Sequence, residues 1–194
     1  MAKSKAKAGG VGAGDAPKLV DALVRAWPGA LPKGGGVRSL PEAKPLFASA
    51  GEVRTAIILA LLPVISRTWD EKVAAERAED GKPVAKRDYH AYDAVVDRLN
   101  GLHKLLADLL RGADDFSGRD CDALFEWVAT QDETHLLYLD RARMVRFAEQ
   151  LAARGELGRR TRTGLRAIKV SLGRTPTGAN LRLIDAIDTL VAHR

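Results

Sequence analysis

Apolar side chains recur at steps of three and four residues through the middle of the chain. This spacing matches the period of an α-helix, so it places the apolar residues on one face. It predicts a helix over about residues 84–111, with Asn100-Gly101 as a weak point at which two shorter helices are the alternative. The residues that carry the pattern are Tyr92, Val95, Val96, Leu99, Leu102, Leu106, Leu109 and Leu110.

Comparable patterns, bordered by residues that start or stop helices, occupy most of the chain. Ala, Leu and Arg are abundant, and all three lose little conformational entropy in a helix. No segment shows the two-residue alternation of a strand bounded by turns, so the sequence predicts an all-α protein. The further helices are expected over about residues 15–27, 49–78, 118–131, 134–155, 161–173 and 178–193.

The domain organisation follows from the places where glycine, proline and lysine gather. Residues 1–14 combine glycines and lysines without an apolar run, which predicts a flexible basic arm. Residues 28–48 hold four of the eight prolines and three consecutive glycines, which predicts a loop. We expect residues 15–194 to form a single α-helical domain that contains this loop.

The expected helices of the C-terminal half recur at a constant distance. Their starts near residues 117 and 134 return near 161 and 178, an offset of 44 residues. In this spacing, the segment of about residues 117–193 resembles HEAT and armadillo repeats, whose paired helices have a period of about 40–47 residues. The resemblance implies stacked helix pairs, which need caps or a larger parent because one unit cannot bury its apolar face alone. An irregular multi-helix bundle is the alternative arrangement.

Residues 111–127, RGADDFSGRDCDALFEW, contain four aspartates and the only cysteine. An EF-hand calcium loop needs glycine at its sixth position and glutamate at its twelfth, and the register that supplies the glycine puts Leu124 at the twelfth. The pattern fits a helix start better, with Ser117 as the N-cap and Asp120 three residues later. Cys121 then falls on the apolar face of the helix. We therefore expect neither a metal site nor a catalytic thiol here.

Basic residues concentrate in the last quarter of the chain. The whole chain carries a net charge of +6, whereas residues 141–194 alone carry +8. Residues 154–174 contain seven basic side chains and one acidic side chain. On a helix, Arg162, Arg166 and Lys169 share one face, and two arginines extend it into the preceding loop. The candidate anion- or partner-binding residues are Arg159, Arg160, Arg162, Arg166 and Lys169.

This basic face has three interpretations. It docks an acidic protein surface, it contacts nucleic-acid phosphates, or it is a solvated face paired with acidic helices of the same chain. No set of residues in the sequence makes a catalytic constellation. The favoured prediction is therefore a non-catalytic helical interaction or scaffold module that docks a protein partner.

Two alternatives stay open. The first is a nucleic-acid-binding protein that uses the arginine-rich segment 154–174, assisted by Lys3, Lys5 and Lys7. The second is an enzyme of unrecognised type. That alternative needs a concave pocket that holds at least two polar groups with perturbed pKa values, and convergence of His90, His103 or His135 with carboxylates would favour it.

The sequence further predicts a cytoplasmic protein that has neither a cofactor nor a membrane partner. A single cysteine excludes an intrachain disulfide. The longest apolar run, Thr55 to Ser66, is shorter than the roughly 20 residues that a membrane span requires. The first 14 residues lack the apolar stretch of a signal peptide.

Overall fold

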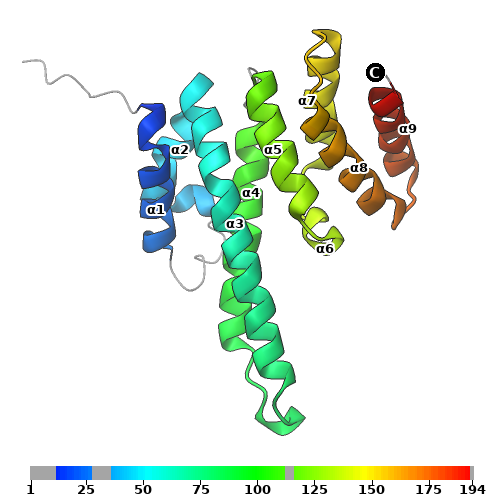
Figure 1. Cartoon of the computed structure of the whole chain (residues 1–194). Coiled ribbons are helices and arrows are strands. Elements are labelled where there is room, and N and C mark those ends of the chain that lie inside the picture. Colours follow the sequence, from blue (N-terminus) through cyan, green and yellow to red (C-terminus); the bar gives the residue numbers. More distant parts are fainter. Residues whose placement is uncertain (1–11, 28–35, 112–115, 193–194) are drawn as a thin grey trace, which may run out of the picture.

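The fold is known from a computed structural model that describes residues 12–27, 36–111 and 116–192. Within these ranges the ordered elements are helices and no strand occurs, which confirms the all-α prediction. The body is a row of helices that follows chain order, from α1 at one edge to α9 at the other (Figure 1).

Most of the predicted helices are present with small shifts at their ends. The α-helices are α1 (Ala16–Ala26), α2 (Lys44–Ala48), α3 (Gly51–Asp80), α4 (His90–Arg111), α5 (Gly118–Thr130), α6 (Glu133–Leu136), α7 (Arg141–Ala153), α8 (Arg159–Gly173) and α9 (Gly178–Ala192). Four 3-10 turns accompany them: η1 (Ala13–Asp15), η2 (Val37–Ser39), η3 (Pro41–Ala43) and η4 (Val84–Lys86).

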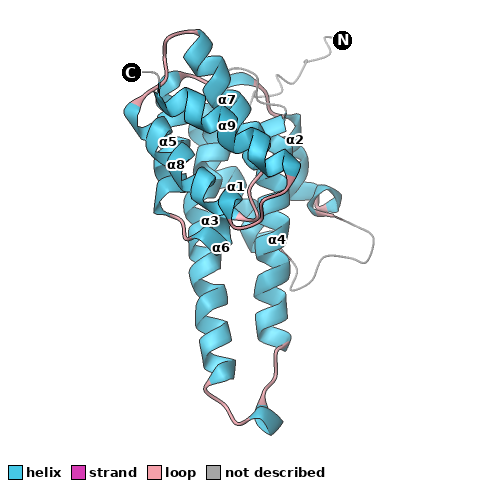
Figure 2. Ribbon diagram, turned by 90° about the vertical axis from the view of Figure 1, so that its right-hand side faces the viewer, coloured by secondary structure: helices cyan, strands magenta, loops and turns pink. Residues whose placement is uncertain are grey.

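Helices α3 and α4 form a long antiparallel hairpin that gives the molecule its shape. Their base packs within the body, and their far halves project from it as an arm (Figures 1 and 2). Asn100-Gly101 does not divide α4, which is continuous from His90 to Arg111, and Gly101 is buried within it. The predicted start of this helix was too early, since η4 and an extended Arg87 precede His90.

The body contains one continuous cluster of buried apolar side chains. Helix α1 packs on α3, α5 lies between α3 and α8, and α9 packs on both α7 and α8. Burial of these side chains supplies the main driving force for the assembly of the helices. Representative members, from α1 to α9, are Leu23, Leu46, Ile57, Leu61, Leu106, Phe125, Phe147, Leu165, Ile168 and Ile187.

The helix predicted over 134–155 is divided, which is a correction to the sequence analysis. Two aspartates start two separate helices: the Asp132 carboxylate accepts the His135 N–H at 2.8 Å, and the Asp140 carboxylate accepts the Arg143 N–H at 3.1 Å. The constant 44-residue offset is therefore not kept. Helices α5 and α8 begin 41 residues apart, and α7 and α9 begin 37 residues apart.

The segment predicted as a loop, 28–48, is more ordered than expected where the structure describes it. Residues 28–35 lie outside the described residues, but η2, η3 and α2 occupy most of residues 36–48. Pro41 and Pro45 sit in the first turns of η3 and α2. Proline is tolerated there because a first-turn N–H has no partner within the helix. Of the predicted basic arm, residues 1–11 also lie outside the described residues.

Helix α8 meets α5 at a close approach of their backbones. A Cβ atom built on Gly164 would lie 2.4 Å from the Phe125 carbonyl oxygen and 2.8 Å from the Phe125 Cβ. Only a residue without a side chain fits at this distance, because the obstacle is backbone that cannot rotate away. Gly164 therefore sets how closely α8 packs and how it is rotated.

Replacing Gly164 by alanine is expected to lower the free energy of unfolding by about 3 kcal/mol, the cost of forcing an extra carbon into a packed contact. Gly173→Ala in the same helix is the control. A Cβ there meets nothing within 4 Å, so we expect a change of at most about 1 kcal/mol in the stabilising direction. Urea denaturation followed by circular dichroism measures both. Equal effects of the two variants would contradict the close contact.

Candidate functional site

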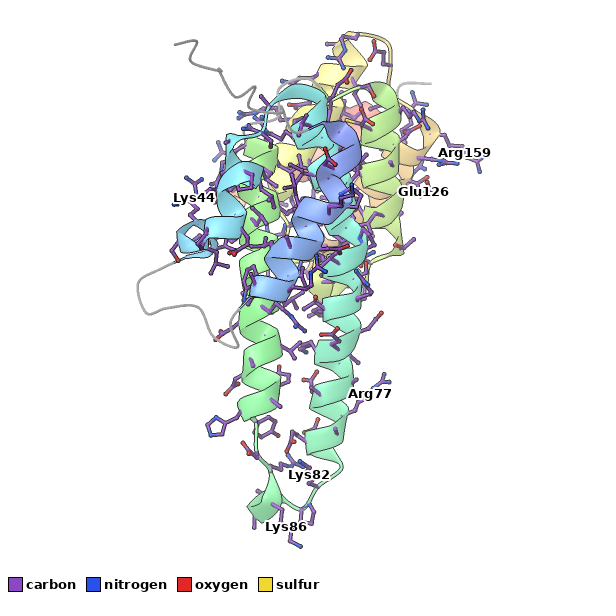
Figure 3. The ribbon with its side chains drawn as sticks, turned by 90° about the vertical axis from the view of Figure 1, so that its left-hand side faces the viewer. Lys44, Arg77, Lys82, Lys86, Glu126 and Arg159 are labelled. Atoms are coloured by element: carbon purple, nitrogen blue, oxygen red, sulfur yellow. The ribbon has the colours of Figure 1, made fainter. Side chains whose placement is uncertain are left out.

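The exposed face of α8 is the candidate site. Arg159, Thr163, Arg166 and Val170 succeed one another at steps of four, three and four residues, and all four are exposed. At 3.6 residues per turn they form one line along the helix, which we call the α8 stripe. Arg159 extends from the body into solvent (Figure 3). Val170 is 55% exposed, a large fraction for an aliphatic side chain.

The basic residues beside this line turn toward neighbouring helices. Arg160 Nη1 lies 2.5 Å from Glu126 Oε2 of α5, and Lys169 Nζ lies 2.5 Å from Asp188 Oδ1 of α9. Ion pairs as exposed as these contribute about 0–1 kcal/mol each to stability. Their larger effect is on charge, because each one neutralises a positive group of the predicted basic face.

Arg162 occupies an intermediate position. Its side chain is half-buried, and its Nε atom is buried without a hydrogen-bond partner among the described residues. The five predicted residues thus come from one helix but do not act as one surface. Two of them, Arg159 and Arg166, face solvent and form no ion pair with another described residue.

The rotation of α8 is fixed by an aspartate from another helix. Asp122 Oδ1, on α5, accepts the Thr161 N–H at 3.0 Å and the Thr161 hydroxyl at 2.7 Å. Asp122 thereby caps the N-terminus of α8, whose own N-cap residue, Gly158, has no side chain to do so. Sequence reasoning missed this contact, because it joins residues 39 apart.

A hollow of about 270 Å³ borders the α8 stripe on its α5 side. Glu126, Ala129 and Thr163 line it together with the side chains of Arg159 and Arg160. The hollow therefore combines one carboxylate, one hydroxyl and two guanidinium groups, which suits a partner with hydrogen-bonding groups better than a purely apolar one.

The aspartate-rich segment is a helix start, as the sequence predicts. The Ser117 hydroxyl oxygen accepts the Asp120 N–H at 3.2 Å, and the same hydroxyl donates to the Asp120 carboxylate at 2.6 Å. Cys121 is buried, and burial raises the pKa of its thiol to about 12, so it stays protonated. No group of three metal-ligating side chains occurs in the part of the chain that the structure describes.

Two histidines form a buried pair that sequence reasoning did not foresee. His103 Nε2 of α4 lies 3.0 Å from His135 Nε2 of α6, so one ring donates and the other accepts. Aromatic rings enclose the pair: Trp69 stacks on His135 at 4.6 Å, and Tyr138 stacks on His103 at 5.3 Å. The two imidazole rings thus contact each other and aromatic rings. Asp132 and Asp70 are near enough to His135 to act on its pKa. The remaining candidate, His90, lies at the exposed start of α4.

Burial dominates the protonation of the pair. It lowers the pKa of His103 to about 3, assisted by repulsion from His135. It lowers the pKa of His135 to about 4, although Asp132 and Asp70 oppose that shift. Both rings are therefore neutral at neutral pH. The hydrogen bond between them is consistent with this, because the ring that accepts it must be neutral.

Stability is expected to fall as the pH is lowered from about 6.5 toward 4, because the unfolded histidines take up protons that the folded pair excludes. Between pH 7 and pH 4.5 each histidine should remove about 2.5 kcal/mol from the free energy of unfolding, and the pair therefore about 5 kcal/mol. Urea denaturation across this range measures the slope.

The double variant His103→Leu/His135→Leu is the comparison for this slope, since it lacks both titrating groups. Carboxylates elsewhere titrate alike in both proteins, so their contribution is removed in the difference. If the variant and the wild type lose stability equally between pH 7 and pH 4.5, the histidine pair does not cause the loss.

Comparison with known proteins adds no family to this description. No family model, curated protein or solved structure matches the chain. The chain is thus assigned to a class by its fold alone: it is an all-α protein. Among the described helices, none combines the length and the apolar character needed to cross a membrane.

Proposed function

We propose that this protein is a non-catalytic helical docking module that binds an acidic protein surface through the α8 stripe. The observation that carries the proposal is the division of charge on α8. Arg160 and Lys169 are neutralised by acidic neighbours, whereas Arg159 and Arg166 stand unpaired among the described residues. Unpaired guanidinium groups recognise carboxylates with two parallel hydrogen bonds.

The chemistry of the stripe defines the partner. It carries a hydroxyl at Thr163 between the two arginines and an exposed aliphatic group at Val170. From Arg159 to Val170 the helix rises by about 16 Å, at about 1.5 Å per residue. A partner helix with carboxylates about two turns apart and an apolar residue one turn beyond matches this arrangement. Arginine and apolar side chains together are also typical of the parts of interfaces that contribute most to affinity.

The stripe lies on a framework that we propose to be two stacked helix pairs, as the resemblance to HEAT and armadillo repeats implies. The pairs are α5 with α7 and α8 with α9. In support of this arrangement, α5 packs on α8, and α7 packs on α9. A stack of this kind presents extended surfaces for partners, because each unit contacts only its neighbours.

The nucleic-acid alternative is less well supported by the charges of residues 154–174. Four of the seven basic residues there are paired with carboxylates of this chain: Arg154 with Glu156, Arg160 with Glu126, Lys169 with Asp188, and Arg174 with Glu133. Counterion release depends on the number of phosphates neutralised, so this pairing reduces the affinity expected for nucleic acid. The sequence analysis also assigned a role in nucleic-acid binding to Lys3, Lys5 and Lys7. These three lysines lie outside the described residues.

The proposal is tested with the double variant Arg159→Glu/Arg166→Glu. The probe is a fluorescein-labelled helical peptide with two glutamates seven residues apart and a leucine four residues beyond the second. We expect the wild type to bind this peptide, and the variant to bind it at least about tenfold more weakly, because two attractive charge pairs become repulsive. Fluorescence anisotropy at low salt measures both affinities.

The control variant is Arg77→Glu/Arg146→Glu, which makes the same change in net charge at exposed positions of the arm and of α7. It should bind the peptide as the wild type does. If both variants weaken peptide binding equally, the loss of affinity comes from the change in net charge. That result would contradict specific binding by the α8 stripe. Salt-steep binding of duplex DNA or single-stranded RNA that is lost only in Arg159→Glu/Arg166→Glu would establish the nucleic-acid alternative instead.

A further inference from the structure

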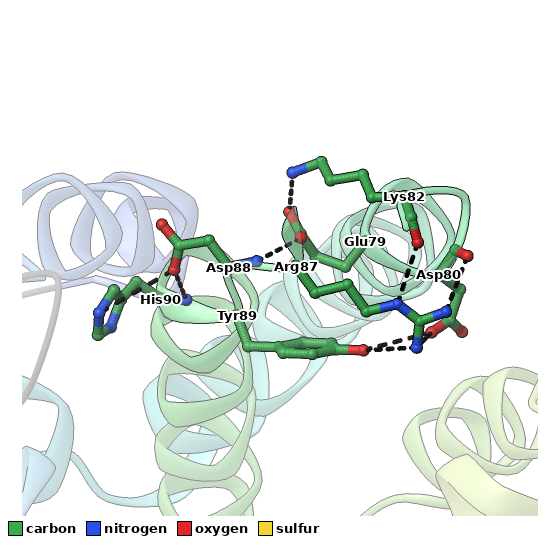
Figure 4. A network of polar contacts seen from close by, with 7 residues as sticks. All are labelled: Glu79, Asp80, Lys82, Arg87, Asp88, Tyr89 and His90. Atoms are coloured by element: carbon green, nitrogen blue, oxygen red, sulfur yellow. Dashed lines mark hydrogen bonds and ion pairs between the residues drawn. The ribbon is translucent and has the colours of Figure 1, made fainter. Parts of the chain in front are cut away.

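Hydrogen bonds and ion pairs cross-link the turn at the tip of the arm (Figure 4). Glu79 Oε1 lies 2.5 Å from Lys82 Nζ, and Glu79 Oε2 accepts the Asp88 N–H at 2.8 Å. Arg87 donates to the backbone carbonyl oxygens of Lys82 and Asp80, at 3.2 Å each. Lys82 lowers the pKa of Glu79, assisted by the Asp88 N–H, so this carboxylate stays ionised and holds both sides of the turn.

This turn presents an apolar side chain to solvent. Val84 opens η4 at the far end of the arm and is 79% exposed. Lys86, two residues later, extends from the same tip and forms no ion pair with another described residue (Figure 3). A preorganised turn that displays one aliphatic group beside one free positive charge is suited to enter an apolar hollow with an acidic rim.

A hollow of that character lies at the opposite end of α3. It measures about 600 Å³, and its apolar wall is formed by Ala13, Ala56 and Leu59. Glu52, in the first turn of α3, and Asp120, in the first turn of α5, supply two carboxylates to its lining. Glu52 takes no part in the ion pairs found among the described residues.

We propose that the arm tip of one molecule docks in this hollow of a second copy of the chain. Val84 lies against Ala56 and Leu59, and Lys86 meets Glu52. The tip and the hollow belong to opposite ends of one helix of 30 residues, about 45 Å long, so they cannot meet within one molecule. The contact is therefore heterologous. It joins molecules head to tail, and it forms an open chain unless the rotation between copies closes a ring.

Sedimentation velocity over a range of protein concentrations tests the proposal. Because one small turn enters one hollow, the interface is small, and we expect a dissociation constant of about 0.1 mM. Wild-type protein should sediment faster as its concentration rises to about 1 mM. Val84→Asp and Glu52→Lys, both at exposed positions, should each stay monomeric in isolation. Circular dichroism checks that each variant is folded.

A mixture of these two variants distinguishes head-to-tail docking from other contacts. Glu52→Lys keeps its tip and Val84→Asp keeps its hollow, so the mixture should form 1:1 dimers and nothing larger. The charge-swapped double variant Lys86→Glu/Glu52→Lys should regain self-association. In this variant the tip carries the negative charge and the hollow carries the positive charge, so the two attract each other again.

Four results would overturn the proposal. The first is wild-type protein that remains monomeric at about 1 mM. The second is loss of association in Val84→Asp but not in Glu52→Lys, which means that the tip contacts another surface. The third is the reverse pattern, which means that the hollow takes another occupant. The fourth is a charge-swapped variant that stays monomeric.

Discussion

The close contact of α8 with α5 determines what this protein can present to a partner. Gly164 lets the α8 backbone approach Phe125, and Asp122 caps the start of α8 through Thr161. Together these two contacts fix both the distance and the rotation of α8. Rotation decides function here, because a turn of α8 by one residue, about 100°, would carry the stripe out of solvent and into a neighbouring helix. The unpaired state of Arg159 and Arg166 is thus a consequence of packing on the opposite, buried face of the same helix.

The sequence predicts the helices well, because their apolar periodicity is local information. The Ser117 cap and the burial of Cys121 are confirmed, since both depend on residues within one turn of each other. The division of 134–155 was missed, although Asp132 and Asp140 are suitable N-cap residues. The apolar pattern continues across the break and conceals it. A search for a capping aspartate within each predicted helix would have found both starts.

The candidate site was predicted only in part, because charge pairing is a property of the tertiary structure. The sequence pattern assigned the five basic residues to one helix and the loop before it, and all five lie on α8, but the pattern could not tell that Glu126 and Asp188 face two of them. The positive charge that residues 141–194 present at the surface is therefore smaller than their net charge of +8 suggests. The histidine pair illustrates the same limit: His103 and His135 lie 32 residues apart, and no pattern of spacing relates them.

Helix α3 connects the two ends of the molecule that differ most in chemistry. Its first turn contributes Glu52 to an acidic hollow, and its last turn contributes Glu79 to a tip that displays Val84 and Lys86. Acidic side chains are favourable near the N-terminus of a helix and unfavourable near its C-terminus. Lys82 and the Asp88 N–H compensate Glu79 at this unfavourable end, and the same contacts cross-link the turn. The same carboxylate thus joins the last turn of α3 to Asp88, which lies just before the start of α4.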